Sequence, residues 1–64
     1  MDNQNIKHTV TGRRQVPNDS VVEAVRGKKA ICVRLSDGRM AWGYADSWEA
    51  AESEAIVKAK GVQL

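Results

Sequence analysis

The residues that could carry out chemistry in this 64-residue chain are few and scattered. His8 is the one histidine and Cys32 the one cysteine, so the sequence contains no histidine–cysteine cluster that would bind zinc. The four serines lack a base partner, and neither a nucleophile elbow nor a glycine-rich phosphate loop is present. We therefore expect a protein that is not an enzyme and that uses no metal or cofactor.

The charged residues are distributed unevenly along the chain. Residues 1–34 contain seven basic and three acidic residues, a net charge of +4, whereas residues 35–64 contain three basic and five acidic residues, a net charge of −2. This asymmetry is compatible with ordinary solubility, and it also suits a basic patch for nucleic acid or an acidic partner. The candidate binding residues are Arg13, Arg14, Arg26, Lys28, Lys29, Arg34 and Arg39.

Composition indicates the cellular compartment. A lone cysteine in a domain too small for a large core favours a reducing environment, because secreted domains of this size usually contain disulfides. The polar N-terminus has no apolar segment typical of a signal peptide, and no stretch approaches the ~20 apolar residues of a membrane span. We expect a cytoplasmic protein without a membrane partner.

A β-hairpin is the clearest structural pattern. Residues 30–35 and 40–44 alternate between large and small or polar side chains, and Asp37-Gly38 between them is typical of a two-residue type I′ turn. That turn would pair Leu35 with Met40, Val33 with Trp42 and Ile31 with Tyr44. All six large apolar side chains would then share one face.

The segment before the hairpin contains a third candidate strand. Residues 20–25 are rich in valine, and residues 26–29 resemble a turn, although a short helix over residues 20–26 is the alternative. Pairing Val25 with Ala30 would place Glu23 opposite Cys32. Residues 1–19 are expected to form an N-terminal arm, which would be mobile, or an extra edge strand, since Ile6, His8 and Val10 alternate with polar residues.

A helix is predicted at the C-terminus. Asp46 is a suitable N-cap with Glu49 three residues later, and Gly61 is a suitable C-terminal stop. The apolar residues at helical spacing form one stripe: Trp48, Ala51, Ala55, Ile56, Ala59 and Val62.

These elements predict an α+β fold in which one C-terminal helix packs on one face of a three-stranded antiparallel meander. Residues 20–64 would form this single β-β-β-α domain. Trp42 and Trp48 are both expected on the helix side of the sheet. Binding would therefore use the opposite sheet face, which contains Arg34, and the basic turn of residues 26–29.

Residues 29–60 resemble small DNA-binding modules built from a three-stranded sheet and a helix, of the plant AP2 type and the arm-binding domains of phage-type integrases. The resemblance lies in the hairpin over residues 33–39, the strand exit over residues 43–47, and Glu49 and Ala51 on the helix. It implies that the sheet enters the major groove, with Arg34 and Arg39 reading bases and Arg26, Lys28 and Lys29 contacting phosphates.

Two classes of function follow from these patterns. The first expectation is a protein-binding adaptor or inhibitor, of the kind that phages encode against host or defence proteins. The alternative is a nucleic-acid-binding module that binds duplex DNA through the basic sheet face and turn. Under either hypothesis a homodimer is an open alternative, since a second copy could cover the exposed face or pair with an edge strand.

Overall fold

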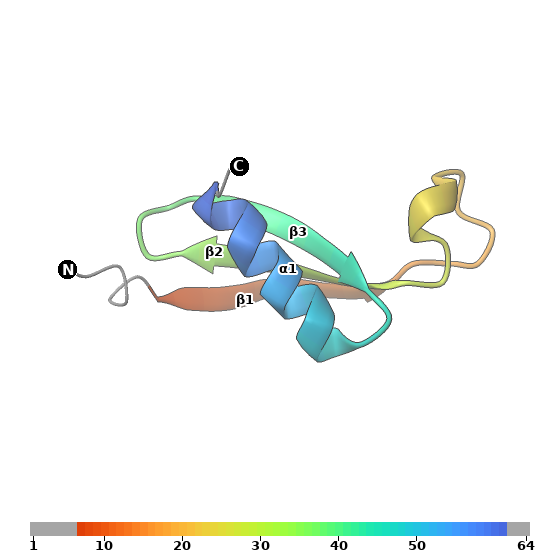
Figure 1. Cartoon of the computed structure of the whole chain (residues 1–64), viewed down its shortest axis with the longest axis horizontal. Coiled ribbons are helices and arrows are strands. Elements are labelled where there is room, and N and C mark those ends of the chain that lie inside the picture. The colour runs from red at the N-terminus through yellow and green to blue at the C-terminus, as the bar shows by residue number, and fades with distance from the viewer. Residues whose placement is uncertain (1–6, 62–64) are drawn as a thin grey trace.

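A computed structural model describes residues 7–61 of the chain. It contains three strands, a short 3-10 helix and one α-helix, in the order β1 (His8–Gln15), η2 (Glu23–Val25), β2 (Lys29–Leu35), β3 (Met40–Ala45) and α1 (Trp48–Lys60). The strands form one antiparallel sheet in the order β1-β2-β3, and α1 crosses one face of it (Figure 1). The predicted α+β fold, with a C-terminal helix on a three-stranded sheet, is confirmed.

The β2–β3 hairpin is present, but its predicted register is wrong by one residue. The Leu35 carbonyl accepts a hydrogen bond from the Gly38 amide at 2.9 Å, and the Leu35 amide donates to the Arg39 carbonyl at 2.7 Å. These bonds close a three-residue loop that ends in Gly38, whose φ of 98° is typical of the glycine in a G1 bulge. The additional loop residue pairs Cys32 with Trp42 and Val33 with Ala41, so Trp42 lies on the face away from α1.

The hairpin loop makes the stability of the protein depend on pH through Asp37. The Arg39 guanidinium and backbone amide donate to the Asp37 carboxylate and lower the pKa of that group below its ordinary value of 3.8. This stabilisation is fully present above pH 3.8, which is the pKa of the group in the unfolded chain. It is lost as the pH falls through the lower pKa of the folded state. Asp37→Asn should weaken this acid dependence, measured as urea midpoints across the acid range. An identical profile in the variant would contradict this assignment.

The first strand lies earlier in the chain than predicted. Residues 20–25 were expected to pair with β2, but they belong to a long loop that contains η2, and β1 occupies that edge of β2. β1 pairs with every residue of β2 and also contacts the helix, because His8 Nε2 lies 2.6 Å from the Glu52 carboxylate. The two alternatives for the N-terminal segment were a mobile arm and an edge strand, and residues 8–15 form an edge strand. Ile6 lies outside the described residues.

The helix begins one residue later than the Asp46 cap predicts. Ser47 is the N-cap, and its hydroxyl accepts a hydrogen bond from the Ala50 amide at 3.1 Å. Asp46 instead forms an ion pair with Lys28, at 3.0 Å. Gly61 ends the helix in a left-handed conformation with a φ of 70°, as predicted. Val62, assigned to the apolar stripe, lies outside the described residues.

The core lies between α1 and the sheet. The large buried side chains come from β2 (Ile31, Val33 and Leu35), and the helix contributes Ala51, Ala55 and Ala59. Alanine and glycine allow a close approach: a Cβ on Gly43 would lie 2.2 Å from the Ala51 carbonyl oxygen. The Glu54 carboxylate accepts a hydrogen bond from the Tyr44 amide, so this backbone donor on the outer edge of β3 has a partner. No helix within residues 7–61 is long and apolar enough to cross a membrane.

Candidate functional site

The sheet face away from α1, here called the reverse face, is the surface that the fold leaves uncovered by the helix (Figure 1). Because β1 has an irregular register between Val10 and Gly12, the consecutive residues Thr11 and Gly12 both belong to this face. Strand pairing and side-chain alternation assign ten residues to it: Thr9, Thr11, Gly12, Arg14, Ala30, Cys32, Arg34, Met40, Trp42 and Tyr44. None of the three strands contains an aspartate or glutamate. The acidic side chains of the described residues belong to loops, turns and α1. The reverse face is therefore basic and partly apolar.

Trp42 lies across the centre of the reverse face. Trp42 on β3 is opposite Cys32 on β2, and Cys32 is in turn opposite Gly12 on β1. A Cβ built on Gly12 would lie 3.0 Å from Cη2 and 3.4 Å from Cζ2 of the Trp42 indole, so the ring reaches over β2 to the first strand. Cys32 beneath it is buried, while Trp42 itself remains 38% exposed. The prediction that Trp42 belongs to the helix-side core is wrong.

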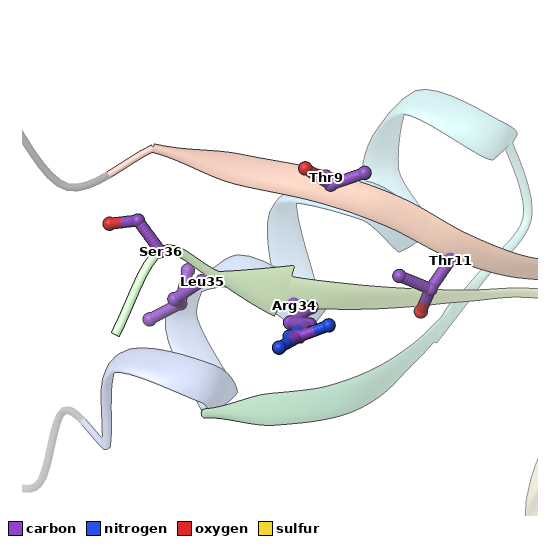
Figure 2. Close-up of a pocket in the computed structure, with 5 residues that line it drawn as sticks. All are labelled: Thr9, Thr11, Arg34, Leu35 and Ser36. Atoms are coloured by element: carbon purple, nitrogen blue, oxygen red, sulfur yellow. The ribbon is translucent and has the colours of Figure 1, made fainter. Parts of the chain in front are cut away.

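A hollow of about 260 Å³ lies next to Arg34. Figure 2 shows Thr9 and Thr11 on β1, and Arg34 on the adjacent β2, with α1 behind the sheet. Leu35 and Ser36 complete its lining. The Arg34 guanidinium and the Thr9 hydroxyl provide hydrogen-bond donors for an anionic group, whereas the Thr11 hydroxyl donates to the Cys32 carbonyl at 3.4 Å.

Arg14 lies at the other end of the reverse face. It is opposite Ala30, four residues from Arg34 along β2, so the two arginines are about 13 Å apart along the strand direction. Arg14 also lines a second hollow, of about 250 Å³, between the sheet and the long loop. The other residues lining this hollow are mostly apolar: Val16, Pro17, Ser20, Val22, Val25 and Tyr44.

Three of the predicted binding residues are engaged elsewhere in the fold. Arg39 contacts the Asp37 carboxylate and donates to the Lys60 carbonyl at 2.9 Å, so it connects the hairpin loop to the end of α1. Lys28 forms its ion pair with Asp46 beyond the end of the sheet. Arg26 lies in the long loop, where it donates to a backbone carbonyl and is 3.9 Å from the Glu23 carboxylate.

Two more predicted residues lie on the helix side. The Arg13 guanidinium is 4.8 Å from the Trp48 ring centroid, and the Lys29 ammonium is 5.7 Å from it. Such cation–π contacts attach the ends of β1 and β2 to the first turn of the helix. The structure therefore places two of the seven candidate residues, Arg14 and Arg34, on the reverse face. Neither forms an ion pair or side-chain hydrogen bond with another residue of 7–61.

The tip of the long loop exposes a second, smaller apolar surface. Val21 is 93% exposed and Val22 is 55% exposed. The loop extends beyond one end of the sheet (Figure 1), and hydrogen bonds close its base, including one from the Val16 amide to the Lys28 carbonyl at 2.9 Å. Two valines are thus held in solvent by a structured loop.

Sequence reasoning did not identify Trp42, Thr9 or Thr11 as surface residues of one site. Thr9 and Thr11 alternate with His8 and Val10, but the sequence leaves both a mobile arm and an edge strand open for this segment. It therefore does not define which face these two side chains share. Among residues 7–61, no three histidine, cysteine, aspartate or glutamate side chains lie in a group that could hold a metal ion. The chain matches no protein-family model, no curated protein and no solved structure with which it was compared.

Proposed function

We propose that the protein binds nucleic acid through the reverse face of its sheet. The observation that supports this function is the row formed by Arg34, the exposed Trp42 and Arg14, on a face without acidic residues. Arginine binds phosphates through several hydrogen bonds, and tryptophan stacks on bases. The two arginines have no ionic partner within residues 7–61, so binding a phosphate would break no internal ion pair there.

The distribution of charge supports the same proposal. Glu49, Glu52 and Glu54 lie on α1, on the opposite side of the sheet from Arg14 and Arg34. The carboxylates of α1 therefore do not face a polyanion bound on the reverse face. On the helix side the three glutamates are offset by Lys58 and Lys60 on α1 and by Arg13 and Lys29 beside Trp48. Arg39, Lys28 and Arg26 each lie beside a carboxylate within the fold, so they are not expected to contribute specific contacts.

The experiment is a titration of labelled DNA, single-stranded and duplex, between about 50 and about 200 mM salt. Arg14→Gln with Arg34→Gln should weaken binding about tenfold or more at low salt, because two charge-assisted contacts are lost. The slope of log affinity against log salt should fall in magnitude by about 2.

The matched control is the double variant Lys29→Gln with Lys60→Gln, because Lys29 contacts Trp48 on the helix side and Lys60 lies in the last turn of α1. It removes the same net charge away from the reverse face, so it should keep most of the affinity and the salt slope. Equal losses in the two double variants, or no measurable binding by the unmodified protein, would rule out the reverse face as a nucleic-acid site.

A protein partner is the second candidate function, and the exposed Val21 and Val22 support it. Apolar side chains held in solvent by a structured loop are typical of contact residues for another protein. An adaptor or inhibitor of this kind would keep its partner at moderate salt and would show no affinity for nucleic acid. The same titration therefore distinguishes the two candidates.

A further inference from the structure

The Trp42 indole lies down on the sheet because Gly12 has no side chain. The far edge of the ring occupies the space that a Cβ on Gly12 would need, 3.0 Å from Cη2, and the ring covers Cys32 on the way. A tryptophan in this position does not project far from the sheet. Its outward side, part of the 38% of Trp42 that is exposed, is instead an aromatic surface at the level of the sheet.

This geometry distinguishes between two forms of nucleic acid. In a duplex the bases are stacked on each other and present only their edges in the grooves. A protein that recognises duplex bases therefore needs side chains that project into a groove. In a single strand the bases can unstack and lie against an aromatic ring on the protein. We propose that Trp42 is a stacking platform for one base of single-stranded nucleic acid; this rests on the nucleic-acid function proposed above.

The hollow next to Arg34 provides a place for the phosphate of the same strand. Arg34, which lines it, is two residues along β2 from Cys32. It is therefore about 6.6 Å along the strand from the cross-strand partners Cys32 and Trp42. The hydroxyls of Thr9 and Thr11 lie on its β1 side, as Figure 2 shows. A base on Trp42 and a phosphate beside Arg34 would thus be bound by adjacent parts of one surface.

The test compares a labelled strand of about 12 nucleotides with the duplex of the same sequence, at low salt. Both a DNA and an RNA strand are used, because either could supply the base and phosphate. The single strand should bind at least about tenfold more tightly than the duplex, and Trp42 fluorescence should be quenched on binding. Duplex binding equal to or tighter than strand binding overturns this inference while leaving the proposed function in place; binding of neither overturns both.

Variants of the platform separate stacking from charge. Trp42→Leu should lower the affinity for the strand by about 5- to 150-fold, whereas Trp42→Phe, which keeps a ring, should retain most of it and abolish the quenching. Gly12→Ala should also weaken strand binding, because the added methyl displaces the indole without altering charge. Lys60→Gln is the control away from the surface. Circular dichroism establishes that each variant is folded, and a folded Trp42→Leu with unchanged strand affinity would refute the platform.

Discussion

Gly43→Ala is expected to leave much of the protein unfolded. The added Cβ would lie 2.2 Å from the Ala51 carbonyl oxygen and 2.4 Å from the Ala55 amide nitrogen, so the helix would have to move away from β3. Overpacking of this kind typically costs ~1–3 kcal/mol, and a contact with backbone atoms belongs at the upper end. A core of this size supplies only ~3–5 kcal/mol. Thermal and urea unfolding, followed by circular dichroism, measure the loss.

Gly12→Ala is the matched control for this prediction. It also adds one methyl group to a glycine in a strand, but its nearest neighbours are side-chain atoms of Trp42 at 3.0 Å and of Cys32 at 3.3 Å. The Trp42 ring borders solvent and can move, so the fold should survive with a modest loss of stability. If the two variants unfold at the same urea concentration, the close approach of α1 at Gly43 does not limit stability.

Ile31→Ala is expected to produce the second large loss of stability. Ile31 is 1% exposed and is one of three large side chains that are fully buried, together with Val33 and Leu35. Replacing a buried isoleucine by alanine removes apolar contacts and leaves a cavity, at a cost of ~2–5 kcal/mol. That cost approaches the whole free energy of unfolding expected for such a domain. Urea unfolding should show a midpoint far below that of the unmodified protein.

Val21→Ala provides the comparison for the core variant. It also truncates a β-branched side chain to alanine, but Val21 is 93% exposed, so the free energy of unfolding should change by less than about 0.5 kcal/mol. A large loss in Val21→Ala would mean that the loop tip is covered by something in solution, such as a second copy of the chain. That result would favour the protein-binding candidate.

The two proposed binding surfaces, the reverse face and the loop tip, would bind different classes of partner. The reverse face combines Arg14, Arg34 and Trp42 and suits an extended polyanion, whereas the loop tip presents Val21 and Val22 to an apolar surface. Nucleic-acid binding should weaken with salt because phosphate contacts release counterions. Apolar contact at the loop tip should not weaken in this way. Salt dependence is therefore the property that separates the two functions.

Several features of the fold were determined by local sequence. The Asp37-Gly38 pair predicted the hairpin, and Gly61 marked the end of the helix, because each glycine allows a positive φ that other residues rarely adopt. The alanine stripe of α1 identified the side of the helix that packs on the sheet. These predictions were correct because they depend on backbone conformation and on periodicity within one element.

The tertiary structure decided which side chains form the surface. A loop of three residues rather than two shifted the register and moved Trp42 to the reverse face, although both loops fit the same Asp-Gly pair. Residues 8–15, rather than the valines of residues 20–25, became the first strand, because they pair with all of β2 and contact Glu52 and Trp48 on the helix. Strand pairing depends on contacts between distant segments, and local propensity does not include them.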